Sequence, residues 1–145
     1  MDKFAQFCNM IKNEMTVTLA TGVDNSVTMR VVSPVYCNGR ILIFTNSDSK
    51  KYQQLKANTN CCIAAGPFFA EATAEFCGAC MLPENESLRD NYCEKFTGAF
   101  DEGVEFGGRN AEFILLKPTV LSGWAFENDA PTENDIPTVP FEISL

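Results

Sequence analysis

Two short stretches, residues 29–35 and 43–51, carry the side chains best suited to chemistry in this 145-residue chain. In the first, Arg30 stands among apolar residues that predict a central β-strand. A guanidinium in such surroundings is costly to bury unless an anion meets it, and its planar fork can hold two phosphate oxygens at once. Arg30 is therefore a candidate phosphate ligand.

The second stretch joins the end of a predicted strand to the start of a predicted helix. Thr45 ends the strand, and the helix is expected from about residue 50 to residue 57. Between them lie residues that commonly cap helices, namely Asn46, Ser47 and Ser49. A helix start offers free N–H groups and the positive end of its dipole, and Lys50 and Lys51 add charge there. Together with Arg30, this stretch predicts a site for one phosphate group.

A simpler interpretation stays open for each charged residue taken alone. Lys50 and Lys51 would then be a solvated helical turn, and Arg30 would pair with a carboxylate elsewhere in the chain. The ordered combination of the two stretches favours the phosphate site.

The charge distribution suits a small anionic ligand better than a polymer. The formal net charge is −8, which disfavours nucleic-acid binding. Residues 28–60 nevertheless hold five basic residues and one acidic residue, whereas residues 127–145 hold five acidic residues and no basic one. No apolar run reaches the roughly 18 residues of a membrane span, and the N-terminus lacks the pattern of a signal peptide. We therefore expect a cytoplasmic protein without membrane contact.

The chain has no histidine and seven cysteines. The first fact excludes mechanisms in which histidine activates serine or cysteine, and it excludes histidine ligands to a metal or to haem. The odd number of cysteines and their irregular spacing argue against a disulfide framework. Cys77 and Cys80 have the spacing of a metal-binding or redox pair, but ordinary buried thiols are the preferred interpretation and no metal site is expected.

The rest of the pattern predicts many short strands and few helices. Strands are expected over residues 15–22, 27–36, 41–45, 61–81 (one or two strands), 111–116 and 119–126. Helices are expected over 2–14, 50–57 and 83–100, with a glycine-containing loop over 103–108. The acidic tail, 127–145, ends in either a short edge strand or a disordered segment. This order predicts a mainly β fold, an antiparallel barrel with flanking helices, as a single domain over residues 1–145.

The two stretches also match a family pattern: an Arg-led strand, a strand that ends in Thr, and a helix that begins Ser-x-Lys. The matching segments are Leu19-Ala20-Thr21, Arg30-Val31-Val32-Ser33-Pro34-Val35, Phe44-Thr45-Asn46 and Ser49-Lys50-Lys51, followed by Leu55 and Asn58. In this order they resemble the pyridoxamine 5'-phosphate oxidase-like FMN-binding split-barrel family. The resemblance covers roughly residues 1–75 well and the remainder by element order.

That resemblance implies an antiparallel split β-barrel that binds FMN, usually as a homodimer with the flavin at the subunit interface. It implies that Arg30 and Lys51 hold the phosphate, with Lys50 beside them. The other residues that it places at the cofactor are Val31, Val32, Ser33, Phe44, Thr45, Asn46, Ser47, Ser49 and Trp124. A redox dithiol at Cys77 and Cys80 beside a flavin stays open as an alternative to buried thiols.

The expected function is flavin-mediated hydride transfer to or from a small-molecule substrate or a nicotinamide. True oxidases of the family carry a C-terminal substrate region with arginine and histidine, whereas this chain ends in an acidic tail. The sequence therefore does not predict oxidation of pyridoxamine 5'-phosphate. Two alternatives stay open: a deazaflavin in place of FMN, and a module that binds, stores or senses FMN without turnover.

Overall fold

The computed structural model describes residues 2–128 and 130–145, and Asp129 of the predicted tail lies outside them. The strands are β1 (Val17–Val23), β2 (Ser26–Val32), β3 (Val35–Cys37), β4 (Arg40–Asn46), β5 (Asn60–Ala65), β6 (Phe68–Ala79), β7 (Ala111–Ala125) and β8 (Val139–Ser144). The α-helices are α1 (Lys3–Asn13), α2 (Lys50–Ala57) and α3 (Glu86–Gly107), and short 3-10 turns flank α3 at Pro83–Asn85 and Gly108–Asn110. The predicted mainly β fold with flanking helices is confirmed.

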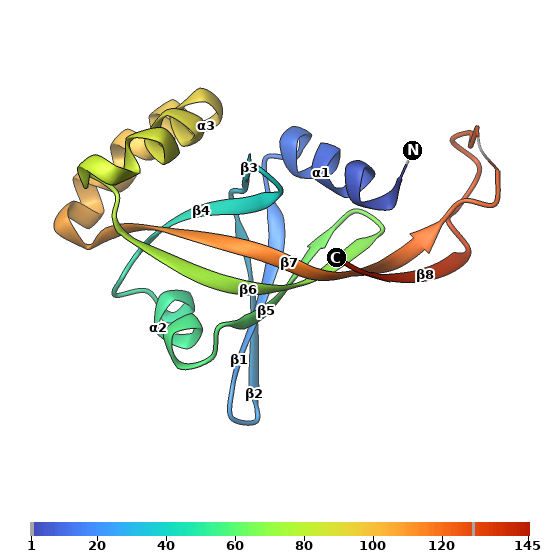
Figure 1. The fold of residues 1–145 in the computed structure, drawn as a ribbon, viewed down its shortest axis with the longest axis horizontal. Coiled ribbons are helices and arrows are strands. Elements are labelled where there is room, and N and C mark those ends of the chain that lie inside the picture. The colour runs from blue at the N-terminus through green and yellow to red at the C-terminus, as the bar shows by residue number, and fades with distance from the viewer. Residues whose placement is uncertain (1, 129) are drawn as a thin grey trace.

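The strands form one antiparallel sheet in the order β2-β1-β5-β6-β7-β4-β3 (Figure 1). The long strand β7 shares one of its edges between two partners: its first half pairs with β4 and its second half with β8. The tail therefore contributes an edge strand, which was one of the two alternatives expected for residues 139–145.

The two outer strands of this order, β2 and β3, are consecutive in the chain and are joined by Ser33 and Pro34. A connection this short spans roughly 10 Å. The sheet must therefore curl until its two ends meet, although no ladder pairs β2 with β3 among the described residues. The result is a barrel that is split along the β2–β3 seam.

Two strand boundaries differ from the sequence prediction because of proline. Residues 27–36 were expected to form one strand, but the chain leaves the ladder at Ser33 and Pro34, which carries no N–H. This break makes β2 an edge strand, so the expectation that Arg30 lies on a central strand was wrong.

At Pro118 the outcome is the reverse, because residues 111–116 and 119–126 form one strand. Pro118 falls between the end of the β4 ladder and the start of the β8 ladder. The register with β6 also shifts there, so that Thr119 is an extra residue between Pro118 and Val120. A strand tolerates proline at such a bulge, where no ladder bond has to be donated.

Helix α3 is longer than expected, since it runs on to Gly107 through residues that were predicted to form a loop. Its interior contains a kink at Phe96, where φ is −131° and ψ is 55°. The kink lets the second half of α3 change direction and stay close to β4.

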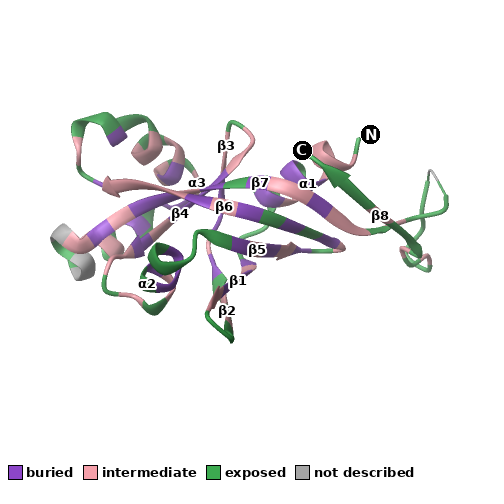
Figure 2. Cartoon of the chain, turned by 60° about the horizontal axis from the view of Figure 1, so that its bottom comes forward, coloured by how far each residue is buried: buried purple, intermediate pink, exposed green. Residues whose placement is uncertain are grey.

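The core has two parts that lie on opposite faces of β4. Ile41 and Ile43 belong to the barrel interior, together with residues of α1, β1 and β5–β7. Leu42 and Phe44 face α3, where Tyr92 and Phe113 complete a second cluster. Because both faces are covered, the middle of β4 reads as an unbroken apolar run. Figure 2 shows buried positions gathered on the central strands, while β8 and the turn between β1 and β2 are exposed.

Lys95 on α3 ties three separate segments together at the barrel seam. Its ammonium donates hydrogen bonds to the carbonyls of Ile11 (2.8 Å), Glu14 (2.6 Å) and Pro34 (2.8 Å). It thus joins the end of α1, the approach to β1 and the β2–β3 connection to α3. Partial burial lowers the pKa of Lys95, and the charge of Glu14 acts in the opposite direction. Among the described residues no carboxylate lies within ion-pair distance of the ammonium, so its hydrogen bonds go to the three carbonyls.

We predict that Lys95→Met lowers the free energy of unfolding by about 1.5–3 kcal/mol, the usual range for hydrogen bonds to a charged group. The exposed Lys117→Met on β7 is the matched control, because it removes the same charge without removing those contacts. Urea denaturation of the two variants measures the difference. Equal stability of the two would mean that the Lys95 bonds contribute nothing net to the seam.

Candidate functional site

The guanidinium of Arg30 lies in a network of neutral oxygen atoms that β1 and α2 contribute. It donates to Thr21 Oγ1 (2.7 Å), Gln54 Oε1 (2.9 Å) and Leu19 O (3.3 Å). Thr21 donates in turn to Gln54 Oε1 at 2.6 Å, and both side chains are buried. Desolvation lowers the pKa of Arg30. The network holds the guanidinium in place but leaves its positive charge uncompensated.

Lys51 in the first turn of α2 is the second cation of the site. It is half-buried, and its pKa is lowered first by burial and then by the charge of Arg30. The two like charges are therefore close enough to repel each other. Within the described chain, the ion pair that forms joins Arg40 to Glu75, and no carboxylate pairs with Arg30 or Lys51. The alternative in which Arg30 pairs with a carboxylate is thus not what this structure contains.

The start of α2 adds hydrogen-bond donors to these charges. Ser49 is the N-cap: its hydroxyl accepts from the Tyr52 N–H at 3.3 Å and shares a 3.0 Å hydrogen bond with Thr45. No acceptor in the described chain takes the N–H groups of Lys50 and Lys51. Both remain available to an anion in front of the helix, as the sequence predicted.

The polar residues between β4 and α2 shape this turn. Asn46 Oδ1 accepts from the Asp48 N–H at 2.9 Å, and Ser47 O accepts from the side chain of Gln53 at 2.7 Å. These two predicted site residues therefore hold the turn in shape, while Lys50 points into solvent as an exposed side chain.

The predicted apolar residues divide between the surface and the core. Val31 is 65% exposed on the outer face of β2, whereas Val32 is buried in the barrel interior. Ser33 is half-buried at the seam. Phe44 turns away from the barrel interior and packs against Tyr92 and the other rings beneath α3.

A hollow of about 340 Å³ opens between the start of α2, the end of β4 and α3, and Lys51 is part of its wall. Thr45, Asn46 and Ser49 line its polar side, and Phe44 and other residues line its apolar side. We call this cavity the α2–α3 hollow. Its volume is at the lower end of the range for small-molecule sites.

Trp124 is not brought to this site within one chain. It lies near the far end of β7, where its neighbours across the sheet are Pro140 and the turn at Pro67. Figure 1 shows α2 and β8 at opposite ends of the molecule. The predicted contact between Trp124 and the cofactor stays a prediction that requires a second subunit.

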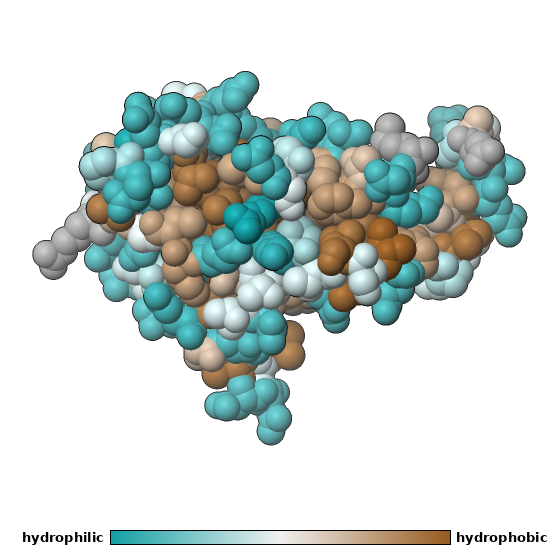
Figure 3. All heavy atoms as spheres, viewed as in Figure 1, coloured by the Kyte–Doolittle hydropathy of each residue, from teal (hydrophilic) through white to brown (hydrophobic). Residues whose placement is uncertain are grey.

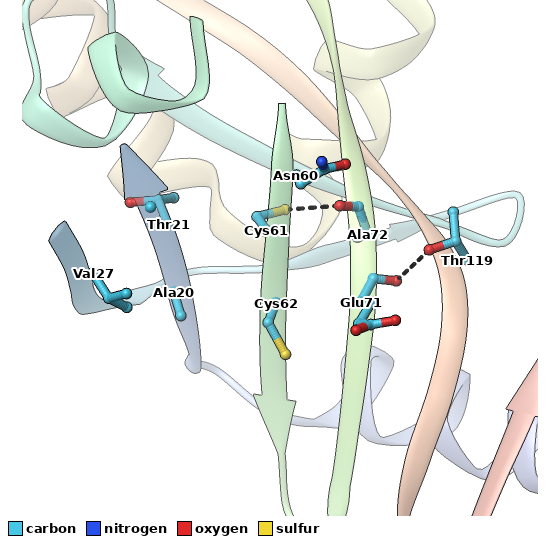
Figure 4. Close-up of a pocket in the computed structure, with 10 residues that line it drawn as sticks. Ala20, Thr21, Val27, Asn60, Cys61, Cys62, Glu71, Ala72 and Thr119 are labelled. Atoms are coloured by element: carbon cyan, nitrogen blue, oxygen red, sulfur yellow. Dashed lines mark hydrogen bonds between the residues drawn. The ribbon is translucent and has the colours of Figure 1, made fainter. Parts of the chain in front are cut away.

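A second hollow, of about 510 Å³, lies on the outer face of the sheet across β1, β5 and β6 (Figure 4). Cys62 and Glu71 line it, and the pKa of the Cys62 thiol is raised first by burial and then by the Glu71 charge. Its lining contains an acid and no base, so it does not suit a phosphate.

Cys77 and Cys80 lie at the end of β6, on the side of the sheet that faces α3. Cys80 is buried, Cys77 is half-buried, and burial raises the pKa of both thiols. In the described part of the chain no three potential ligand side chains gather to hold a metal ion. Both side chains pack with the second core cluster, as ordinary buried thiols do.

Sequence reasoning did not place Thr21 and Gln54 at the site as the residues that hold Arg30, although signals for both were present. A two-residue turn at 24–25 sets the β1–β2 register, which brings Thr21 and Arg30 to the same face. Gln54 follows Lys51 by three residues and so shares its helix face. Tyr92 in the hollow was also missed, because nothing local connects α3 with β4.

Comparisons with known proteins were made by sequence and by structure. No family model matches the sequence, and a search of curated proteins finds no match.

No helix in the described residues has the length and apolar character needed to cross a membrane.

Solved structures, in contrast, match at high probability. A candidate pyridoxamine 5'-phosphate oxidase from Listeria innocua has a TM-score of 0.63 at 12% identity, covering 83% of this chain and 96% of that one. A FAD-binding protein from Mesorhizobium loti has a TM-score of 0.65 at 15% identity, with coverage of 82% and 92%. A haem-binding protein from Mycobacterium smegmatis has a TM-score of 0.69 at 12% identity, covering 99% of this chain and 59% of that one.

At sequence identities of 12–15%, a structural match indicates a shared fold but does not indicate a shared ligand. The neighbours themselves differ in what they are named for, flavin in one and haem in another. Their common architecture matches the curled antiparallel sheet described above. The chain therefore has the split-barrel fold of the pyridoxamine 5'-phosphate oxidase-like proteins, as its motifs predicted.

Proposed function

We propose that this protein binds FMN and uses it as an oxidoreductase. The observation that carries the proposal is the pair of neighbouring cations, Arg30 and Lys51, which no described carboxylate neutralises. Two like charges held together cost free energy unless an anion joins them. A terminal phosphate in front of α2 would relieve that repulsion and would accept from the free N–H groups of the first turn.

Three features favour FMN over other anions. The apolar side of the α2–α3 hollow lies directly beside the charged side, so a ligand with a phosphate and an aromatic part fits both. The flavin-binding neighbour shares the fold. Haem is less well supported, because the chain has no histidine to serve as an axial ligand.

FMN, when bound, would supply hydride chemistry, and this chain would supply position and charge. Arg30 and Lys51 would anchor the phosphate, and Phe44 and Thr45 would contact the part of the cofactor next to it. The chain has no histidine and no carboxylate among the described residues that line the hollow, so the site nominates no particular side chain as an acid or base. The substrate would be a small molecule or a nicotinamide.

The same absence of an acid or base within the described site favours a second candidate, a module that stores or senses FMN without turnover. Stopped-flow mixing of the loaded protein with NADH separates the two. Bleaching of the flavin absorbance faster than that of free FMN supports the oxidoreductase, and unchanged absorbance supports the module.

The free thiols throughout the described chain fit a reducing cytoplasm.

We further propose that the protein is a homodimer. The outer face of β2 exposes three apolar side chains, Val27 at 76%, Met29 at 69% and Val31 at 65%. Figure 3 shows hydrophobic side chains exposed between polar ones at several places, including the β1–β2 hairpin. Contiguous apolar surface is rarely left open in a soluble monomer, and a two-fold dimer commonly covers it. A second subunit would also bring another Trp124 toward the flavin.

We predict that FMN binds at least about a hundredfold more tightly than riboflavin, because two charge-assisted hydrogen bonds to the phosphate contribute about 1.5 kcal/mol or more each. Calorimetric titration of the apoprotein with each compound gives the comparison. Equal affinities would remove the phosphate anchor and, with it, the proposed cofactor site.

Arg30→Ala should weaken FMN binding by roughly 10- to 100-fold, since it removes one charged anchor. Lys56→Ala is the matched control on α2: Lys56 is exposed, and its ammonium lies 4.1 Å from the Phe76 ring centroid rather than at the site. We expect it to change FMN affinity less than about twofold. Similar losses in both variants would indicate diffuse charge attraction instead of a defined site.

Light scattering at micromolar concentration should give about twice the 16.0 kDa mass of one chain. Val31→Lys, which places a charge on the exposed face of β2, should shift the protein toward the monomer and weaken FMN binding. A monomeric wild-type protein with full FMN affinity would contradict the dimer while leaving the phosphate anchor intact.

A further inference from the structure

Gln54 connects the Arg30 guanidinium to helix α2. Its Oε1 accepts hydrogen bonds from Arg30 Nη2 at 2.9 Å and from Thr21 Oγ1 at 2.6 Å, and its Nε2 donates to Thr28 Oγ1 at 3.2 Å. Arg30 also donates to Thr21, so these three side chains form a closed ring of hydrogen bonds. Gln54 and Thr21 are buried, and the ring therefore fixes where the guanidinium lies.

A carboxylate at this position would bind the guanidinium more strongly than an amide does. Glutamate has nearly the same shape as glutamine and a similar helix propensity, and a hydrogen bond to an ionised acceptor is about twice as strong as one to a neutral acceptor. The Thr28 hydroxyl can turn and donate to a carboxylate instead of accepting from Nε2. If residue 54 served only to fix Arg30, glutamate would do so better.

An amide at position 54 leaves the guanidinium charge available, whereas a carboxylate would neutralise it. Two acids near the start of α2 bond to other groups: Asp48 accepts from Asn110 at 3.1 Å, and Glu112 accepts from Tyr52 at 2.9 Å. Within the described chain neither acid forms an ion pair with either cation of the site. The two positive charges and the helix start are therefore left for a ligand.

The number of charges decides which anion such a site prefers. A phosphate monoester, such as the terminal phosphate of FMN, has a second pKa of about 6 and so carries close to two negative charges at neutral pH. A phosphate diester, such as each phosphate of FAD, carries one, and so does a sulfate monoester. Coulomb energy scales with the product of the charges, so the two cations attract the phosphate monoester about twice as strongly.

We infer that Gln54 is a specificity-determining residue: as a neutral amide it holds Arg30 at the anion site without cancelling its charge, and the site thereby selects a doubly charged phosphate monoester over singly charged esters. The inference deepens the proposed function and rests on it, because the anion is taken to be the FMN phosphate. It assigns FMN rather than FAD as the flavin, although one structural neighbour is named as FAD-binding.

The test compares FMN with riboflavin 5'-sulfate, which has nearly the same shape and one negative charge fewer, and with riboflavin, which has no charged group. Each compound is titrated by calorimetry into the ligand-free protein at neutral pH. We expect the wild type to bind FMN at least about tenfold more tightly than the sulfate ester. FAD should also bind more weakly than FMN.

Gln54→Glu should weaken FMN binding by roughly 10- to 100-fold, because the new carboxylate takes the place of the ligand as the partner of Arg30. The sulfate ester should lose only about three- to tenfold, since one negative charge responds half as strongly as two, and riboflavin less than about twofold. The ratio of the FMN affinity to the sulfate affinity should therefore fall. Lys56→Gln is the matched control, because it changes the net charge by the same amount at an exposed position of α2 and should leave that ratio unchanged.

Urea denaturation of the ligand-free proteins separates this role from simple support of the fold. Ligand-free Gln54→Glu should be at least as stable as the wild type, because its carboxylate compensates the charge of Arg30. A residue that only supported the fold would lower stability and affinity together when replaced. Lys51→Gln removes the second cation without changing the buried ring, and it should lower the same affinity ratio.

Equal affinity of the wild type for FMN and the sulfate ester, or for FMN and FAD, would overturn this inference while the FMN site stands. An unchanged affinity ratio in Gln54→Glu or in Lys51→Gln would overturn it as well, and so would a ligand-free Gln54→Glu that is less stable than the wild type. Equal binding of FMN and riboflavin by the wild type would overturn the proposed function, and this inference with it.

Discussion

The short connection through Ser33 and Pro34 is the constraint on which the rest of the structure depends. It joins the two outermost strands of the sheet order, so seven strands must curl until β2 and β3 are neighbours at the seam. Proline ends the ladder there, and its carbonyl is available to Lys95 because no strand pairs with it. Curling encloses the barrel interior, and it also leaves the end of β4 and the start of α2 beside the strand that carries Arg30. The site exists because the sheet closes in this way.

The site at Arg30 and Lys51 contains an unfavourable electrostatic interaction between like charges. The charge of Arg30 lowers the pKa of Lys51, after the larger effect of burial, and the groups around Arg30 are neutral oxygens that orient it without cancelling its charge. A site arranged in this manner is less stable alone than with an anion bound, because binding removes the repulsion. The free energy of unfolding should therefore be lower for the ligand-free protein than for the anion-bound protein, as is usual for binding sites that hold unfavourable interactions.

Strand β4 links this charged region to the aromatic cluster. Alternate residues point into the barrel and toward α3, so Thr45 reaches the N-cap of α2 while Phe44, next to it, joins the rings around Tyr92. One strand end thus contributes to both sides of the α2–α3 hollow. Gly103 allows α3 to complete the hollow, since any side chain there would displace Phe44.

The sequence by itself determined the antiparallel barrel, the helix start at Ser49 and the cations around it, because these depend on alternation and capping within a few residues. The tertiary structure decided what depends on distant segments. Pro34 broke a strand whereas Pro118 did not, and the difference lies in the neighbouring strands. The pairing of Arg30 with Thr21 and Gln54, the approach of Tyr92 to Phe44 and the separation of Trp124 from the anchor within one chain were likewise settled only by packing. Local pattern sets each element, but contacts between elements far apart in the chain are fixed only when the whole sheet closes.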